Sequence, residues 1–157
     1  MLSERVIGKK AWVTGAAHGI GRASAWALAE AGADVAISDI NEKGLEETAE
    51  YIRKLGRKAL VLPADITKEN EIEETINTIV DKWGKLDIAY CNAGTFQDIP
   101  AEDMPLEEFE RVIKVNLTGV NNPVPVSLLS GDRKPQIRFL GNHHSGSGNL
   151  YHKSFRM

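Results

Sequence analysis

The sequence predicts an α/β protein built on a doubly wound parallel sheet, and three observations lead to this fold class. Short apolar runs alternate along the chain with longer segments whose apolar residues recur at helical spacing, in the order βαβαβαβα. The connections between them are short, which favours right-handed crossovers between parallel strands. The first apolar run ends in a glycine-rich turn.

Four strands are expected, at residues 11–14, 34–38, 59–62 and 86–91. Their nearly continuous apolar character is typical of strands that are covered on both faces. The three tryptophans, Trp12, Trp26 and Trp83, are expected to be core or packing residues.

Four helices are expected between and after these strands. Residues 20–31 should pack through a face of small side chains, and Gly32 should end this helix. Asn41 should cap a charged helix that runs to about residue 55, and Thr67 should cap the next one. Residues 106–119 predict one amphipathic helix. The apolar positions expected to face the core are, in order, Ile20, Ala23, Ala27 and Ala31; Ile72, Ile76, Ile79 and Val80; and Phe109, Val112, Ile113 and residues 115–117.

Three glycines lie where the first predicted strand passes into the first predicted helix. Gly15 permits the tight turn, while Gly19 and Gly21 allow a pyrophosphate to approach the backbone and the helix to pack on the sheet. Amides at the helix start, around His18 and Ile20, would face the phosphates. The position between a strand and a helix favours a dinucleotide site of Rossmann type, with a plain turn as the alternative.

Asp39 ends the second predicted strand, close to the offset of about 20 residues expected for a ribose-binding acid. Its carboxylate would accept hydrogen bonds from the ribose hydroxyls and repel a 2′-phosphate. The next residues, Ile40 and Asn41, are not basic, and His18 is the only candidate cation nearby. NAD is therefore favoured over NADP. A turn or helix-capping aspartate is the alternative.

These residues resemble motifs of the classical short-chain dehydrogenases/reductases. Residues 14–21 (TGAAHGIG) are similar to the TGxxxGxG turn of that family, and Asp65-Ile66 resembles the family's acidic residue after the third strand, which contacts adenine. Asn92-Ala93-Gly94 matches the NAG motif, which supports the sheet and lines the cofactor site. Asn116, within VNLTG, resembles the asparagine of the catalytic tetrad. The resemblance covers about residues 6–120.

The resemblance implies a Rossmann-like fold and hydride transfer between NAD(H) and an alcohol or ketone carbon of a small molecule. The family is usually homo-oligomeric, which is doubtful for this chain. A non-catalytic nucleotide-binding fragment is the alternative. Single residues also have plainer interpretations: Asp65 could cap a turn, Asn92 and Gly94 could only form turns, and Asn116 could point at solvent.

The family's Tyr-x-x-x-Lys pair is not found in this sequence. Phe155 lies four positions after Tyr151, whereas Lys153 lies two positions after it. Pro123 and Pro125 should also break the helix that begins at residue 106.

The composition changes at the same place in the chain. Residues 121–157 carry one acid and five bases, a net charge of +4, against −7 for residues 1–120. Residues 1–120 are thus predicted to form the dinucleotide-binding domain, and 121–157 a divergent or frame-shifted tail. The sheet is expected to be truncated after about the fourth or fifth strand. Residues 136–140 offer only a poor substitute strand, which would leave residues 86–91 as a bare edge and the chain weakly stable.

The overall composition excludes several other classes of protein. The net charge of −3 gives no case for a nucleic-acid or acidic-membrane partner. No signal peptide, long apolar span or metal site is legible, and Cys91 is the single cysteine. A cytoplasmic location is expected, with Cys91 as a buried strand thiol and not a nucleophile.

Overall fold

The computed structural model describes residues 6–119 and 138–141. They form a parallel sheet of five strands in the order β3-β2-β1-β4-β5. In chain order the strands are Lys10–Thr14 (β1), Asp34–Ser38 (β2), Ala59–Val61 (β3), Ile88–Cys91 (β4) and Arg138–Gly141 (β5). The predicted Rossmann-like α/β fold is confirmed.

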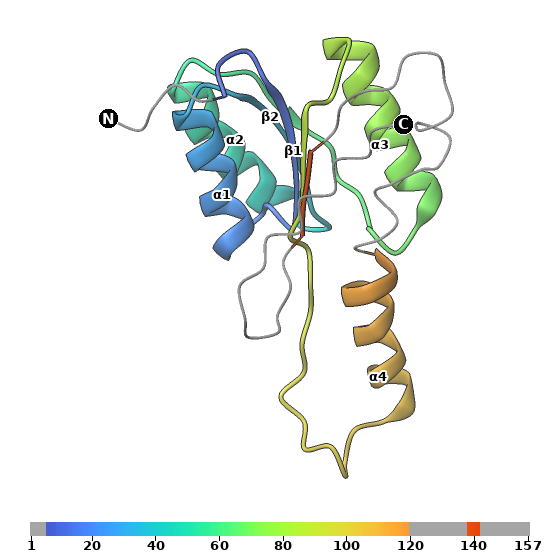
Figure 1. Ribbon diagram of the computed structural model, residues 1–157. Coiled ribbons are helices and arrows are strands. Elements are labelled where there is room, and N and C mark those ends of the chain that lie inside the picture. Colours follow the sequence, from blue (N-terminus) through green and yellow to red (C-terminus); the bar gives the residue numbers. More distant parts are fainter. Residues whose placement is uncertain (1–5, 120–137, 142–157) are drawn as a thin grey trace.

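The helices cover both faces of the sheet, as Figure 1 shows. Helices α1 (Gly19–Glu30) and α2 (Glu42–Lys54) lie side by side on one face, and α3 (Glu69–Trp83) lies on the other. The strand order reverses between β1 and β4. In sheets of this kind, ligands bind at the carboxyl ends of the strands beside such a reversal.

The core consists of two layers, one on each face of the sheet. Alternate residues of β1 enter opposite layers: Val13 packs with Leu45 and Ile52 of α2, while Trp12 packs with Ile72 and Ile76 of α3. The indole N–H of Trp12 is not left unpaired, because it donates to Ser38 Oγ at 2.9 Å. The core role predicted for Trp12 is confirmed.

The face of α1 that packs on the sheet differs from the predicted one. Gly21, Ala25 and Ala29 are buried, whereas Ile20 is 59% exposed. The reason lies at Gly21, where a Cβ atom would stand 2.1 Å from the carbonyl oxygen of Gly15. That close approach fixes the rotation of the helix and turns the face of Ile20, Ala23, Ala27 and Ala31 away from the core.

Of the two predicted helix caps, Asn41 is confirmed and Thr67 is not. Asn41 caps α2, its side-chain oxygen accepting from the Gly44 N–H at 3.1 Å, and the helix ends before Leu55 as predicted. Thr67 does not cap α3, which begins at Glu69. Instead the backbone N–H and hydroxyl of Thr67 both donate to Oδ1 of Asp65, at 2.9 and 2.8 Å.

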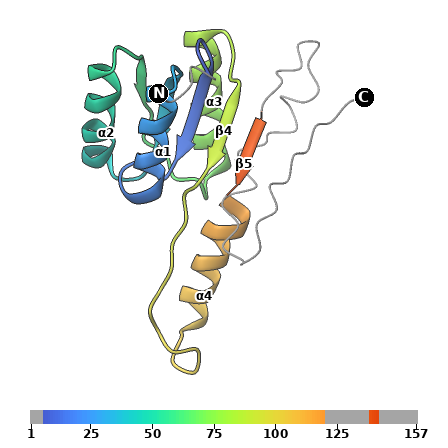
Figure 2. The ribbon, with the colours of Figure 1, turned by 60° about the vertical axis from the view of Figure 1, so that its left-hand side comes forward.

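The helix predicted for residues 106–119 has the predicted bounds, but its last turn is π-helical and its apolar face does not enter the core. The segment begins as α4 (Leu106–Ile113) and continues as a π-helical turn, η1 (Lys114–Gly119). No residue within Leu106–Ile113 is buried, because α4 extends beyond the carboxyl ends of the strands (Figures 1 and 2). Phe109, expected in the core, is 52% exposed.

The bare edge expected at β4 is also wrong. Strand β5 pairs with β4 in parallel register, from Ile88↔Arg138 to Cys91↔Gly141. The apolar pattern at residues 136–140 was therefore enough for a short strand. The remaining residues of the predicted tail, including Pro123, Pro125, Tyr151 and Lys153, lie outside the described residues. Among the helices that are described, none has the length and apolar character needed to cross a bilayer.

Candidate functional site

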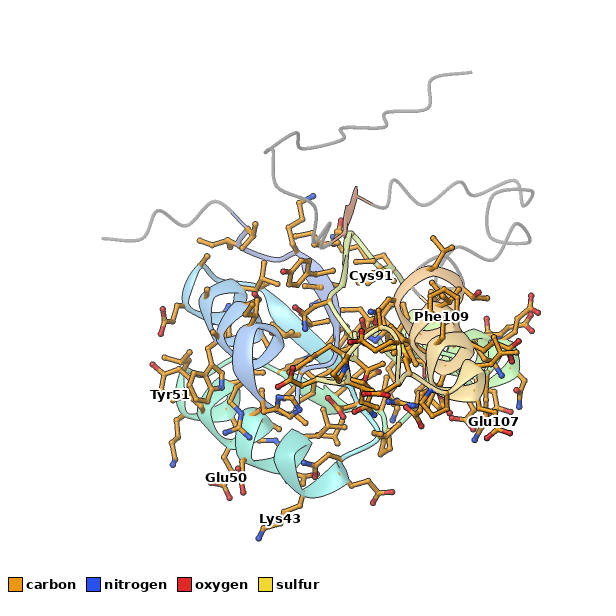
Figure 3. The ribbon with its side chains drawn as sticks, turned by 90° about the horizontal axis from the view of Figure 1, so that it is seen from below. Lys43, Glu50, Tyr51, Cys91, Glu107 and Phe109 are labelled. Carbon is orange, nitrogen blue, oxygen red and sulfur yellow. The ribbon has the colours of Figure 1, made fainter. Side chains whose placement is uncertain are left out.

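The candidate site lies at the carboxyl ends of β1, β2 and β4, the edge that Figure 3 views. These strands end at Thr14, Ser38 and Cys91. Thr14 and Ser38 are partners in the parallel register, and β4 is aligned with β1 through Val13↔Tyr90. The predicted site residues Gly15, Asp39 and Asn92, which directly follow these strands, are therefore brought together.

Each glycine of the turn meets a different steric demand. Gly15 and Gly19 have positive φ angles of 66° and 56°, which L side chains rarely adopt. A Cβ atom on Gly15 would stand 2.7 Å from Ala93 Cα, and one on Gly21 would meet the Gly15 carbonyl. A Cβ atom on Gly19 would meet no atom of the described residues within 4 Å. The loop is thus closely packed at Gly15 and Gly21 and open at Gly19.

The start of α1 presents backbone donors on this open side. No side chain of the described residues caps the helix at His18, and its first intrahelical bond is the Arg22 N–H to the His18 carbonyl, at 3.2 Å. The amides of Gly19, Ile20 and Gly21 precede that bond and have no partner one turn earlier. Together with the helix dipole, such amides suit an anionic group, so the diphosphate of a dinucleotide fits here.

The carboxylate of Asp39 faces the glycine loop. Its Oδ2 accepts from the Ala17 N–H at 3.2 Å, and its Oδ1 accepts from the Asn41 N–H at 3.0 Å. The second bond is that of a turn aspartate, so Asp39 also has the turn-forming role that was given as the alternative to ribose binding. An ionised carboxylate has about four acceptor sites, so both oxygens keep capacity for ribose hydroxyls. The adjacent Ile40 is 78% exposed.

The prediction that His18 is the only cation near Asp39 is wrong. Arg22 of α1 extends its guanidinium group to the carbonyl oxygens of Ala17 and Gly44. The same guanidinium forms an ion pair with Glu47 at 3.0 Å. Arg22 is therefore already paired with protein oxygens and is poorly placed to receive a 2′-phosphate.

A shallow pocket lies between the carboxyl ends of β2 and β3 and helix α3. Its volume is about 640 Å³, and its lining combines the apolar residues Ile40, Leu62, Pro63 and Ala64 with the polar and charged residues Glu42, Asp65, Lys68, Glu71, Glu74, Thr75 and Thr78. Exposed and partly exposed apolar side chains at this end of the sheet suit a flat aromatic base such as adenine. The neighbouring Ile66 is buried.

The carboxylate of Asp65 is held by Thr67, as the turn-capping alternative proposed. Burial alone would raise the pKa of Asp65, but the bonds from Thr67, helped by Lys68 and Lys114, outweigh it and lower the pKa. The group is thus a fixed negative charge at the rim of the pocket.

Asn92 and Ala93 bind the end of β1 and support the glycine turn. Thr14 Oγ1 accepts from the N–H of Asn92 at 3.0 Å and from that of Ala93 at 3.1 Å. The Asn92 side-chain amide donates to the carbonyls of Thr14 and Gly15, at 3.3 and 3.4 Å. Asn92 therefore does more than form a turn, because it connects β4 to the loop.

Asn116 is exposed, as the solvent-facing alternative proposed, but its side chain is also bonded to Thr95. Its Oδ1 accepts from the Thr95 N–H at 2.8 Å, and its Nδ2 donates to the Thr95 carbonyl at 2.7 Å. A Cβ atom on Gly94 would stand 3.3 Å from Asn116 Oδ1. The π-helical turn thus places Asn116 against the chain that leaves the NAG motif.

Two expectations about reactive groups can be checked directly. Cys91 is buried at the end of β4, so the prediction of a buried strand thiol is confirmed. Burial raises the pKa of this thiol to about 12, which disfavours the thiolate form. Within the part of the chain that the structure describes, no group of histidines, cysteines and acids has the arrangement of a metal site.

Sequence reasoning missed three residues beside the loop, namely Arg22, Gly44 and Thr48. Gly44 was open to prediction, because a glycine in the first turn of a charged helix is a poor helix former without a packing reason. A Cβ atom there would stand 2.7 Å from the Ala17 carbonyl oxygen. Arg22 and Thr48 carry no such local signal.

Comparison with known proteins shows where this arrangement recurs. The model of the short chain dehydrogenase family matches residues 9–128. A glucose 1-dehydrogenase from Gluconobacter oxydans (strain 621H) is 40% identical over 121 residues, which cover 76% of this chain and 46% of that protein.

Two solved structures are similar at a comparable level. An NAD⁺-bound xylitol dehydrogenase has a TM-score of 0.73 at 35% identity, and the match covers 76% of this chain and 46% of that one. A 7α-hydroxysteroid dehydrogenase complexed with NADH and 7-oxo glycochenodeoxycholic acid has a TM-score of 0.70 at 35% identity, covering 78% and 48%. The chain therefore spans about half the length of these relatives.

Proposed function

Because this chain belongs to the short-chain dehydrogenase family, we propose that it binds NAD(H) at the carboxyl ends of β1, β2 and β4. The reaction proposed for the site is hydride transfer between the nicotinamide and an alcohol or ketone carbon of a small molecule. One observation carries the binding proposal. The glycine loop has open space beside Gly19, and the same loop contacts the Asp39 carboxylate through the Ala17 N–H.

The proposed roles follow the order of the strands. The loop of Gly15, Gly19 and Gly21 holds the diphosphate through amides at His18 and Ile20, and Asp39 binds the adenosine ribose. Ile40, Asp65 and Ile66 border the adenine, while Asn92, Ala93 and Gly94 border the nicotinamide half. When bound, the nicotinamide supplies or accepts the hydride. Asn116, which resembles the asparagine of the catalytic tetrad, is the proposed catalytic residue, and its side chain is held by its bonds to Thr95.

NAD is proposed over NADP on electrostatic grounds. A 2′-phosphate on the adenosine ribose would lie near the Asp39 carboxylate and would be repelled by it. Arg22 binds the carbonyl of Ala17, whose N–H donates to Asp39, and its guanidinium is already paired with Glu47 and two backbone carbonyls. The NAD⁺ and NADH complexes of the two similar structures support a nicotinamide coenzyme.

Turnover by this chain is proposed to be absent or impaired. Reduction of a ketone needs a group that protonates the oxygen. No tyrosine in the sequence is followed by a lysine four residues later, since Tyr51, Tyr90 and Tyr151 are followed by Leu55, Gly94 and Phe155. The division into a domain at 1–120 and a tail at 121–157, and the cytoplasmic location, remain predictions.

Parallel binding and turnover assays test this function. Titration with NADH and with NADPH, followed by nicotinamide fluorescence, should show saturable binding and a preference for NADH of about tenfold or more, equivalent to roughly 1.4 kcal/mol. The absorbance of NADH, followed with a panel of alcohols and ketones, should show little change. Tighter binding of NADPH would overturn the coenzyme assignment. Rapid turnover would show that the chain supplies a proton donor which the sequence pattern does not reveal.

A further inference from the structure

The glycine loop is held from behind by two side chains of neighbouring helices. The hydroxyl of Thr48, on α2, lies 2.8 Å from the Ala16 carbonyl oxygen and 2.9 Å from that of Gly44, so that its single proton is shared between the two acceptors. Arg22, on α1, donates through a terminal nitrogen to the Ala17 carbonyl and through Nε to Thr48 Oγ1, at 3.1 Å. Thr48 is fully buried. Two consecutive carbonyls of the loop are thus fixed by one connected pair of side chains.

Fixing these carbonyls also orients the amides on the other side of the same peptides. In a trans peptide the C=O and the following N–H point in opposite directions. Holding the Ala16 carbonyl therefore directs the Ala17 N–H, which donates to Asp39 Oδ2 at 3.2 Å. Holding the Ala17 carbonyl directs the His18 N–H away from α2. The first amide aligns the proposed ribose-binding carboxylate, and the second belongs to the proposed diphosphate site.

The surroundings of Arg22 indicate a structural use for its charge. Its guanidinium carbon lies 5.8 Å from the centre of the Trp26 ring, and Glu47 neutralises it. The first turn of α2 packs so closely on the loop that a Cβ atom at Gly44 would stand 2.8 Å from Ala17 Cβ. Figures 1 and 2 show α1 and α2 side by side on one face of the sheet, and Figure 3 labels Lys43, Glu50 and Tyr51 on α2.

We propose that Arg22 and Thr48 are positioning residues that fix the peptides of Ala16, Ala17 and His18 and thereby set the affinity of the loop for a dinucleotide. Neither side chain needs to contact the ligand. The inference rests on the proposed NAD(H) binding and adds to it a second layer of residues, on α1 and α2, that shape the site.

Four variants of the full chain test this role. Thr48→Val keeps the shape of the side chain but leaves the Ala16 carbonyl without its donor, whereas Thr48→Ser keeps the hydroxyl. Arg22→Met keeps the length of the side chain and removes the donors. Arg53→Met is the matched control, because Arg53 is on α2 and pairs with Glu46 at 3.1 Å, and within residues 6–119 its guanidinium does not bond to the loop.

The readout is the dissociation constant for NADH, measured well below the melting temperature of each variant. Thr48→Val and Arg22→Met should each weaken binding by about tenfold, roughly the effect of one lost hydrogen bond. Thr48→Ser and Arg53→Met should stay within about twofold of the original chain. Rescue by serine separates positioning from general stability, because serine restores the bond and not the methyl packing.

The possible failures are distinguishable. Unchanged NADH affinity in both Thr48→Val and Arg22→Met would overturn the positioning role and leave the proposed function intact. If Thr48→Ser and Arg53→Met weaken NADH binding as much as Thr48→Val and Arg22→Met do, the positioning role is also overturned, because the loss of affinity would not depend on the bonds to the loop. If the original chain does not bind NADH, the proposed function fails and this inference fails with it. Should Thr48→Val not fold, the comparison of Arg22→Met with Arg53→Met decides.

Discussion

At the scale of single residues, Gly19 offers the clearest separation of folding from binding. Gly19 and Gly56 both have positive φ, 56° and 74°, and a Cβ atom on either would meet no atom of the described residues within 4 Å. Alanine at either position should cost about 1 kcal/mol of stability through backbone strain. Only Gly19→Ala should also weaken NADH binding, because its methyl group would occupy the proposed diphosphate space.

Thermal melts and NADH titrations of the two alanine variants check this prediction. We expect similar losses in melting temperature and a loss of affinity confined to Gly19→Ala. Equal NADH affinity in Gly19→Ala and Gly56→Ala would mean that the diphosphate does not lie beside Gly19.

The residues that could be predicted were those whose type carries a local reason. Positive φ and close packing select glycine at Gly15, and close packing alone selects it at Gly21. An acid directly after a strand is informative at Asp39. Arg22 could not be assigned in this way, because its contact with Thr48 joins residues 26 positions apart on different helices. Such a pairing follows from how α1 and α2 pack.

At the scale of elements, two aspartates join the amino ends of the strands. Asp87 accepts from the Lys10 N–H at 2.8 Å and forms ion pairs with Lys9 and Lys85. Asp34 pairs with Lys10 and accepts from the Lys58 N–H. Burial would raise the pKa of each carboxyl, but these bonds and charges outweigh it and lower the pKa below the ordinary 3.8.

This lowered pKa predicts how stability depends on pH. The unfolded chain binds protons more readily at these two groups, so their contribution is present above pH 3.8 and is lost as the pH falls through their folded pKa values. Urea unfolding at a series of pH values should show a free energy that falls steeply below about pH 4. Asp87→Asn should flatten that fall. Asp98→Asn, at an exposed carboxylate with no ion pair within residues 6–119, should not.

The junction of η1 with the chain after the NAG motif depends on Asn116. Asn116→Leu removes both bonds to Thr95. The free energy of local opening of residues 93–97 should therefore fall by about 1–2 kcal/mol. Hydrogen exchange of those amides should speed up, while that of buried β1 stays unchanged. Unaltered exchange at Thr95 would show that the two bonds do not hold this segment.

Helix orientation was harder to predict than helix position. An alanine-rich helix such as α1 has small residues on several faces, so its periodicity does not single out the buried one. The contact between Gly21 and Gly15 decides it. For α4, the sequence does show an apolar stripe. Such a stripe indicates that one face of the helix is apolar, but it does not indicate whether that face packs against the core.

At the scale of the whole molecule, α4 and η1 present an exposed apolar stripe. Leu106, Phe109, Ile113 and Leu117 are 69%, 52%, 41% and 58% exposed. Contiguous apolar surface of this kind promotes association in water. The chain should therefore self-associate as its concentration rises, and Phe109→Ser with Ile113→Ser should reduce this. Sedimentation velocity over a range of concentrations checks it, and a monomer throughout would contradict the prediction.

The sheet was the most predictable feature of the whole molecule. The βα alternation identified parallel strands and their two covered faces, because each strand and helix has its own period. The sequence pattern gave only a weak indication of β5, the strand that pairs with β4. β5 is four residues long, at Arg138–Gly141, and in so short a segment backbone pairing with a neighbouring strand outweighs intrinsic propensity.

Hydrogen exchange with and without saturating NADH tests the central claim most directly, because it locates the ligand along the chain. The account predicts slower exchange in residues 15–21, 39–41 and 92–95, and no change at the amino ends of the strands, residues 9–10 and 85–87. A folded chain whose exchange is unaffected by millimolar NADH, or is slowed only at those amino ends, would contradict it.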